Sequence, residues 1–325
     1  MKAIIPVAGA GTRLRPHTHS TPKVLITVAG KPILGHILDQ LAGLPIDEVV
    51  IVIGHMGEKI REYVDGHYRF KTSYVVQESQ RGLADAIYLT REAVGDSEGL
   101  IILGDTVFRT DFKRIVAKRH GQIGVKQVDD PRRFGVVELD GRRITRLVEK
   151  PERPRSNLAI VGIYLIQHMG RLYSCIEQLM ARKIRTKGEY QLTDALQLLI
   201  DRGEQLEAFT VDGWYDCGKP ETLLATNRQL LELHAKAPAH GAGVVYVPPV
   251  FVDPAATVER SIIGPYVSIA AGSTVRNAIV SDSIIGANVG LDTINLRESI
   301  IGDNAVIHGR QRKLNVGDAS EVDLS

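Results

Sequence analysis

The feature that most restricts the fold is a six-residue recurrence of aliphatic residues in the C-terminal part of the chain. Ile263, Ile269 and Val275 follow one another at intervals of six, and Ile301 and Ile307 repeat the interval. This period fits neither the 3.6 residues of a helical turn nor the two-residue alternation of a strand. It is typical of a parallel β-helix, in which each short strand points one aliphatic side chain inward.

A repeated tetrapeptide supports this interpretation. SIIG occurs at Ser261–Gly264, Ser283–Gly286 and Ser299–Gly302. Its spacings of 22 and 16 residues are unequal, which predicts an insertion in one turn of the β-helix. An ordinary β-sandwich is the alternative fold for this part of the chain.

Upstream of the repeat, residues 2–110 alternate short aliphatic runs with helical patterns. Glu48–Gly54 is almost unbroken in apolar residues, as is typical of a parallel strand buried on both faces, and Leu100–Gly104 is a second such run. Ile33–Leu44 and Leu83–Val94 have helical patterns. This rhythm predicts a doubly wound α/β sheet, with a ligand beyond the carboxyl ends of its strands.

The composition changes between these two patterns. Leu233–Gly243 is rich in Ala, Gly, His and Pro, as is typical of a connecting segment. We therefore predict an α/β domain over residues 1–235, a linker over 236–243 and a β-helix domain over 244–325.

Charge and cysteine content exclude several classes of partner. The formal net charge of +2 gives no bulk attraction for polyanions, so we expect no nucleic-acid partner. No stretch approaches the roughly 18 apolar residues of a membrane span, so we expect no membrane association. Cys175 and Cys217 make no disulfide framework, which favours a cytoplasmic location. We expect Cys217 to be a small packing residue.

The segment Ile5–Lys23, IPVAGAGTRLRPHTHSTPK, indicates an anionic ligand. Gly9 and Gly11 follow a strand and let the backbone approach a ligand closely, where free N–H groups can bind phosphate oxygens. Arg13 and Lys23 then add positive charge. The segment lacks the GxxxxGK of a Walker A loop, and Leu14 stands where a dinucleotide fingerprint needs a third glycine.

Read as a whole, Gly9–Leu25 resembles GxGTRLxPxTxxxPKxL, the signature of the sugar-1-phosphate nucleotidylyltransferases. Further segments resemble motifs of that family in the family's order: GLADA at Gly82–Ala86, LGD at Leu103–Asp105, DPRRFGVVE at Asp130–Glu138, EKP at Glu149–Pro151, SNLAIVGIY at Ser156–Tyr164 and WYDCGKPETLL at Trp214–Leu224. The resemblance covers the first 235 residues or so. It is strongest to glucose-1-phosphate thymidylyltransferases that carry a β-helix tail, and it extends to UTP–glucose-1-phosphate uridylyltransferases.

The resemblance implies a Rossmann-like, GT-A-like mixed sheet followed by a left-handed parallel β-helix, in a homo-oligomeric enzyme. The implied reaction joins a nucleoside triphosphate to glucose 1-phosphate and releases pyrophosphate. The GLADA segment favours a pyrimidine nucleotide, with dTTP ahead of UTP. Thymidylyltransferases commonly carry KQL where this chain has Lys23-Val24-Leu25, which leaves UTP, or GTP with mannose 1-phosphate, as alternatives.

The resemblance also implies the residues of the site. Arg13 and Lys23 are expected to be the catalytic cations at the triphosphate. Asp105 and Asp216 are expected to hold Mg²⁺, which prefers carboxylate and phosphate oxygens. The nucleotide is expected to contact Ala8, Gly9, Gly11, Thr12, Gln77 and Gly82, with Gln77 and Gly82 at the base. The sugar 1-phosphate is expected to contact Gly135, Glu149, Lys150 and Asn157.

A non-catalytic subunit that senses nucleotide sugars is the alternative from a different functional class. Such proteins resemble their catalytic relatives but lose the cations or the metal-binding carboxylates. This chain keeps Arg13, Lys23, Asp105, Lys150 and Asp216, which argues for the enzyme.

Overall fold

The computed structural model describes residues 1–234 and 243–310 of the chain. Two compact units are present: one comprises Met1–Ile26 and Lys31–Thr226, the other Thr27–Gly30 and Asn227–Ser325. The linker predicted over residues 236–243 lies, apart from Gly243, outside the described residues, so the predicted domain limits stay a prediction.

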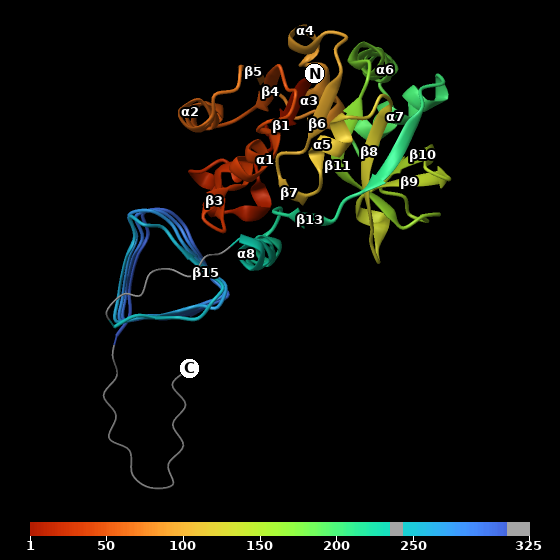
Figure 1. The fold of residues 1–325 in the computed structure, drawn as a ribbon. Helices are drawn as coiled ribbons and strands as arrows, with labels where there is room; N and C mark the ends of the chain where they lie inside the picture. The colour runs from red at the N-terminus through yellow and green to blue at the C-terminus, as the bar shows by residue number, and fades with distance from the viewer. Residues whose placement is uncertain (235–242, 311–325) are drawn as a thin grey trace. The chain divides into compact units, whose positions relative to one another are not determined.

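The first unit is built on a nine-stranded mixed sheet with strand order β5-β4-β1-β6-β11-β8-β12-β10-β9 (Figure 1). The neighbours β5, β4, β1 and β6 are parallel, whereas β11 is antiparallel to β6 and β8. The doubly wound mixed sheet expected from the sequence is confirmed. Its strands are β1 (Lys2–Pro6), β4 (Glu48–Ile53), β5 (Thr72–Val76), β6 (Gly99–Ile102), β8 (Gly121–Gln127), β9 (Gly135–Asp140), β10 (Arg143–Glu149), β11 (Leu158–Ile166) and β12 (Leu206–Thr210).

Helices bury the faces of this sheet. Ile4, Val50 and Ile101 point from three adjacent strands into one apolar cluster, which also takes in side chains of α3, α6 and α7. The intervening residues Ile5 and Ile51 are also buried, as expected for parallel strands covered on both faces. The helices of the first unit are α1 (Ile33–Leu41), α2 (Gly57–His67), α3 (Leu83–Tyr88), α4 (Arg91–Val94), α5 (Phe112–Val116), α6 (Met169–Ala181) and α7 (Leu192–Asp201). The last helix, α8 (Pro220–His234), runs from the first unit into the second.

The single helix predicted over Leu83–Val94 is wrong, because the structure has two short helices there, α3 and α4. Thr90, between them, is fully buried. Its hydroxyl donates to the Ile87 carbonyl at 2.7 Å and lies 2.8 Å from the Tyr173 hydroxyl. A threonine that bonds to nearby backbone competes with the helical ladder, and the apolar pattern does not reveal this competition.

Two segments far apart in the sequence meet in a small separate sheet. Strand β7 (Thr106–Arg109) pairs antiparallel with β13 (Gly213–Asp216), and Asp216 lies opposite Thr106. The N–H of Cys217 then donates to the Asp105 carbonyl at 3.1 Å. This pairing brings Asp105 and Asp216 to adjacent rungs. The remaining short strands outside the second unit's β-helix are β2 (Thr27–Val28) and β3 (Lys31–Pro32).

The second unit contains the parallel β-helix expected from the hexapeptide recurrence, of the left-handed kind that the family resemblance implies. Three four-stranded parallel sheets form the sides of the triangle in Figure 1. The first holds β14 (Val245–Tyr246), β17 (Ile262–Ile263), β20 (Ile279–Ser281) and β23 (Asn295–Arg297). The second holds β15 (Val250–Val252), β18 (Val267–Ile269), β21 (Ile284–Ile285) and β24 (Ile300–Ile301). The third holds β16 (Thr257–Glu259), β19 (Thr274–Arg276), β22 (Gly290–Asp292) and β25 (Val306–His308).

The insertion predicted from the unequal SIIG spacings is wrong. In the third sheet Val258, Val275, Leu291 and Ile307 stack in register, which gives coils of 17, 16 and 16 residues. The first SIIG forms β17 on one side of the triangle, whereas the second and third form β21 and β24 on another. The 22-residue spacing between the first two SIIG repeats therefore equals one coil plus one side of the triangle, and it needs no inserted residues.

Asn227 explains why the short segment Thr27–Gly30 belongs to the second unit. Its side chain is fully buried. The amide oxygen accepts from the Ala29 N–H at 2.8 Å and from the Ser268 hydroxyl at 2.9 Å, and the amide nitrogen donates to the Tyr266 carbonyl at 3.2 Å. One amide thus connects three chain segments.

Truncating an inward side chain of the β-helix should destabilise the second unit. Ile269 is fully buried and stacks in register between Val252 and Ile285. We expect Ile269→Ala to lower the free energy of unfolding by about 2–5 kcal/mol. Val306→Ala is the control, because Val306 is 65% exposed; it should cost about 1 kcal/mol or less. Chemical denaturation measures both, and equal losses would contradict the assigned inward and outward faces.

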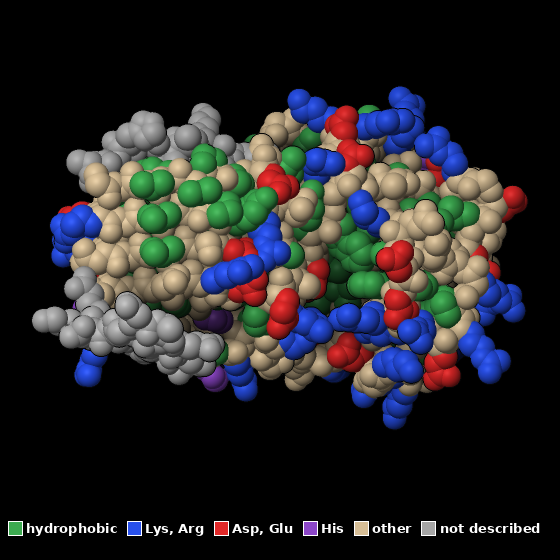
Figure 2. All heavy atoms as spheres, turned by 90° about the horizontal axis from the view of Figure 1, so that it is seen from below, with side chains coloured by type: hydrophobic (Ala, Val, Ile, Leu, Met, Phe, Trp, Pro, Cys, Tyr) green, Lys and Arg blue, Asp and Glu red, His purple; other side chains and the backbone are tan. Residues whose placement is uncertain are grey.

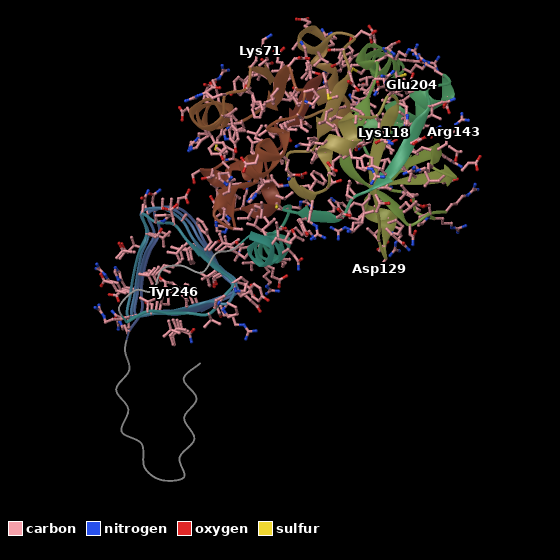
Figure 3. All side chains as sticks on the ribbon, viewed as in Figure 1. Lys71, Lys118, Asp129, Arg143, Glu204 and Tyr246 are labelled. Atoms are coloured by element: carbon pink, nitrogen blue, oxygen red, sulfur yellow. The ribbon has the colours of Figure 1, made fainter. Side chains whose placement is uncertain are left out.

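The surface carries both signs of charge, in keeping with the small net charge. Lys and Arg are interspersed with Asp and Glu on the face that Figure 2 shows, next to rows of hydrophobic side chains. The labelled Lys71 and Glu204 lie at the edge of the first unit (Figure 3). Within residues 1–234 and 243–310, no helix has the length and apolar character needed to span a membrane.

Candidate active site

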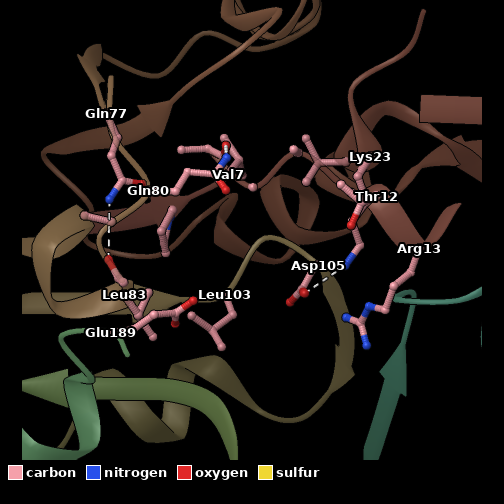
Figure 4. Close-up of a pocket in the computed structure, with 18 residues that line it drawn as sticks. Val7, Thr12, Arg13, Lys23, Gln77, Gln80, Leu83, Leu103, Asp105 and Glu189 are labelled. Carbon is pink, nitrogen blue, oxygen red and sulfur yellow. Dashed lines mark hydrogen bonds and ion pairs between the residues drawn. The ribbon is translucent and has the colours of Figure 1, made fainter. Parts of the chain in front are cut away.

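A cavity of about 530 Å³ opens where the predicted ligand site was expected, beyond the carboxyl ends of β1, β5 and β6 (Figure 4). Gly104 lets β6 turn there, since a Cβ at this position would collide with Val7. The structure brings nine of the predicted site residues to the cavity wall: Ala8, Gly9, Gly11, Thr12, Arg13, Lys23, Gln77, Gly82 and Asp105.

The glycine loop is held in a shape that leaves its amides available. Gly11 has φ 61°, and a Cβ there would lie 2.9 Å from the Cβ of Lys23. The Gly11 carbonyl accepts from the Thr18 hydroxyl and from the Leu14 N–H, both at 2.9 Å. Among the described residues, nothing accepts a hydrogen bond from the N–H groups of Ala8–Gly11. Such amides are suited to phosphate oxygens.

The two predicted cations differ in their surroundings. Lys23 is largely buried, and its ammonium lies 2.8 Å from Asp105 Oδ2. Arg13 is exposed and forms no ion pair with any residue that the structure describes. A Cβ on Gly218 would lie 3.0 Å from a terminal nitrogen of Arg13 and 2.9 Å from Asp216 Oδ1. Arg13 and Asp216 therefore both lie against the backbone of Gly218, and the Arg13 guanidinium remains available to an anion.

The carboxylates Asp105 and Asp216 form the candidate metal site. Burial raises the pKa of Asp105, but the Lys23 ammonium and the Arg13 guanidinium outweigh this effect and lower that pKa below its usual value. Asp105 Oδ1 accepts a long 3.3 Å bond from the Thr106 hydroxyl. In the part of the chain that the structure describes, no group of three or more His, Cys, Asp or Glu side chains is arranged to hold a metal ion. A metal would need further ligands from substrate or water.

Cys217 follows Asp216 in the chain and is fully buried. Burial raises the pKa of its thiol to about 12, so the thiol stays protonated at neutral pH. A protonated, buried thiol is a poor nucleophile, which agrees with a packing role.

Three of the four residues predicted for the sugar phosphate lie together, away from the wall of the first cavity. Gly135 pairs with Glu149 across β9 and β10, and a Cβ on Gly135 would lie 3.2 Å from Glu149 Oε2. The Lys150 ammonium lies 3.3 Å from Glu149 Oε1. Lys150 has φ 44°, a left-handed conformation that lysine rarely adopts. Asn157 is exposed, and its carbonyl accepts from the Val128 N–H at 3.0 Å.

The sequence did not reveal several residues that support these groups. Thr193, in the first turn of α7, donates its hydroxyl to Glu149 Oε2 at 2.7 Å. Gln80 donates its amide to the Ala8 carbonyl at 3.0 Å and lines the cavity with Glu189. Gln80 lies between Gln77 and the GLADA segment, so its position in the sequence could have indicated it as a residue of the site. Thr193 had no local signal.

A sheet whose strand ends present free amides, two cations and two carboxylates defines an α/β enzyme that acts on phosphorylated ligands. A family model described as nucleotidyl transferase matches residues 2–232. The chain belongs to this nucleotidyl transferase family, so the resemblance identified from its motifs is confirmed.

Individual relatives agree with this assignment. The glucose-1-phosphate thymidylyltransferase of Streptomyces griseus is 30% identical over 359 aligned positions that cover all of both chains. The UTP–glucose-1-phosphate uridylyltransferase AglF of Haloferax volcanii is 37% identical over 71% of this chain and 97% of its own. A crystal structure from Bacillus anthracis, provisionally named a glucose-1-phosphate thymidylyltransferase and solved with a sucrose, matches with a TM-score of 0.62 and 32% identity. That match covers 70% of this chain and 94% of the other.

Proposed function

We propose that the chain transfers a nucleotidyl group to glucose 1-phosphate, using dTTP ahead of UTP, and yields an NDP-glucose and pyrophosphate. The observation that supports this most is the cavity in which the free amides of the glycine loop, Arg13, Lys23 and Asp105 face one space. The order of the nucleotides follows two of the relatives: a thymidylyltransferase that matches the whole chain and a uridylyltransferase that matches 71% of it.

In the proposed reaction, a phosphate oxygen of glucose 1-phosphate attacks the α-phosphorus of the nucleotide. A new oxygen–phosphorus bond forms there while the bond to the bridging oxygen of the pyrophosphate breaks. The attacking phosphate monoester has a second pKa near ~6 and needs no general base at neutral pH. The difficulty is the mutual repulsion of two polyanions, so positioning and countercharge supply the catalysis.

The residues divide this work by position. The amides of Ala8–Gly11 would bind phosphate oxygens, and Lys23 would contact the α-phosphate. Arg13, which has no ion-pair partner among the described residues, would hold the departing pyrophosphate. Glu149 would accept hydrogen bonds from sugar hydroxyls, and Lys150 would bind the phosphate of the sugar.

We further propose Mg²⁺ as the metal cofactor. Asp105 and Asp216 suit it, because Mg²⁺ is usually bound by one or two carboxylates and completes its shell with phosphate oxygens and water. When bound, the ion would neutralise charge on the triphosphate. Lys23, which pairs with Asp105, would then share that carboxylate or turn toward the substrate.

The test is an assay of pyrophosphate release with Mg²⁺, run across dTTP, UTP, GTP, CTP and ATP with several sugar 1-phosphates. We expect the highest kcat/KM with glucose 1-phosphate and a pyrimidine nucleotide. Preference for GTP with mannose 1-phosphate would establish the guanylyltransferase alternative. Nucleotide-sugar binding without turnover would establish the non-catalytic sensor.

Replacing Lys150 should separate the two substrates. Loss of its charge-assisted contact predicts that Lys150→Ala raises the KM for glucose 1-phosphate about ten- to a hundredfold. The nucleotide KM should change by no more than about twofold, because Lys150 does not line the cavity that holds Gln77. Arg153→Ala, an exposed cation in the same loop, is the matched control. An equal rise in both KM values would refute the role of Lys150.

We also propose that the enzyme is a cytoplasmic homo-oligomer. The outward residues Val245, Ile262 and Ile279 stack in register on one side of the β-helix and are 56%, 41% and 49% exposed. A contiguous apolar column of this kind favours association. Sedimentation of the full chain tests it, and a monomer at micromolar concentration would contradict it.

A further inference from the structure

The Gln77 side chain has both of its N–H groups committed to the protein. Gln77 follows β5, is 7% exposed and lines the cavity. Its amide nitrogen lies 2.9 Å from Asp85 Oδ2 and 3.4 Å from the Gly82 carbonyl. Figure 4 draws the second of these bonds. The nitrogen end of the amide is therefore unavailable to a ligand.

Asp85 fixes this orientation chemically. It is 1% exposed, and its other oxygen, Oδ1, accepts from an Arg81 terminal nitrogen at 2.7 Å. An ionised carboxylate accepts hydrogen bonds and cannot donate. The amide must therefore turn its NH₂ toward Asp85, which leaves the carbonyl oxygen Oε1 as the free end. Within the described residues, no donor reaches Oε1.

We propose that Asp85 is a positioning residue that sets base selectivity by holding a hydrogen-bond acceptor, Gln77 Oε1, toward the nucleobase. This inference rests on the proposed function and deepens it. Thymine and uracil present a donor, N3–H, on their pairing edge, whereas cytosine presents an acceptor at N3. Guanine also presents a donor, at N1, and adenine an acceptor. Cytosine and adenine also carry a donor on this edge, the N4 or N6 amino group, so the selection depends on Oε1 facing the ring nitrogen. At that position the pair favours thymine, uracil and guanine over cytosine and adenine.

A simpler role for Asp85 is structural. It lies in the first turn of α3, where a carboxylate interacts favourably with the helix dipole. If that were its whole contribution, substitutions of Asp85 would weaken the binding of every nucleotide by a similar factor. The positioning role instead predicts a change in the ratio between nucleotides.

Asp85→Asn is the discriminating variant, because asparagine has nearly the same shape but can donate to Gln77 Oε1. The amide is then free to turn over and present N–H groups to the base. We expect the ratio of the CTP to the UTP dissociation constant to fall by about tenfold or more, and the ratio of the CTP to the UTP kcat/KM value to rise by a similar factor. CTP should improve in absolute terms. An unchanged ratio, with uniformly weaker binding, would overturn the proposal.

Arg81→Gln is the matched control. It removes the charge that pairs with Asp85 but keeps the carboxylate, so the ratio should stay near that of the unaltered protein. Gln77→Leu, which leaves the Asp85–Arg81 pair in place, should bring the UTP and CTP constants close together. If Asp85→Asn does not fold, Gln77→Leu still tests the inference. A Gln77→Leu variant that keeps the difference between the UTP and CTP dissociation constants would refute it. The equilibrium constants test this inference, whereas absence of transfer in the unaltered protein would refute only the proposed function.

Discussion

Arg13→Ala should lower kcat for nucleotidyl transfer by about a hundredfold to a thousandfold. Arg13 is exposed, points toward Gly218 and has no ion-pair partner among the described residues, so its charge is available to the substrate. Its contribution should be largest where charge accumulates on the departing pyrophosphate. Because that charge develops in the transition state, kcat should fall much more than the nucleotide affinity.

Two variants of the same loop serve as controls for this prediction. Arg13→Lys keeps the charge but loses the planar, bidentate donor set, and it should lie between the unaltered protein and Arg13→Ala. Arg15→Ala removes an exposed cation that does not line the cavity, and it should keep nearly full activity. Steady-state kinetics with saturating Mg²⁺ measures all three. Similar losses in Arg13→Ala and Arg15→Ala would indicate a general loop effect.

The parts of the fold with strict periodicity could be predicted from the sequence. Glu48–Ile53 is buried throughout, as its unbroken apolar run indicated. Ile263, Ile269 and Val275 occupy three successive sides of the β-helix. In both cases one local rule places each side chain, because the pattern repeats with the geometry of the element.

The sequence-based predictions of the helix over Leu83–Val94 and of an insertion in the β-helix were wrong because the three-dimensional arrangement outweighed the local pattern. Thr90 ends α3 by bonding to Ile87 and meeting Tyr173 from a distant helix. The SIIG repeats at Ser261 and Ser283 look equivalent in sequence but lie on different sides of the triangle. Which side a repeat occupies depends on the number of residues in each coil, and only the register reveals this number.

The candidate site divides in the same way. The glycine loop and Asp105 could be located from strand ends alone, because ligands of such sheets lie beyond the carboxyl ends. Asp216 becomes a neighbour of Asp105 only through the pairing of β7 with β13. Asp85 could be seen in GLADA, but its contact with Gln77 depends on how α3 packs beside the end of β5. Side-chain partnerships of this kind have no period in the sequence.

Asp105→Asn should abolish most metal-dependent activity, with kcat lower by about a hundredfold or more even at saturating Mg²⁺. Asp105 has two possible roles, as a metal ligand and as the partner that holds Lys23 at 2.8 Å. If Asp105 is a metal ligand, Asp105→Asn should also need a higher Mg²⁺ concentration to reach its half-maximal rate. A role confined to Lys23 predicts an unchanged Mg²⁺ requirement and a loss equal to that of Lys23→Ala.

Asp216→Asn separates these roles further, because Asp216 forms no ion pair with Lys23 in the described structure. If both carboxylates hold the ion, Asp216→Asn should raise the Mg²⁺ requirement as Asp105→Asn does. Asp212→Asn, an exposed carboxylate just before β13, should leave the Mg²⁺ titration unchanged. An Asp216→Asn titration that coincides with that of Asp212→Asn would remove Asp216 from the metal site and leave Asp105 as its only carboxylate from this pair.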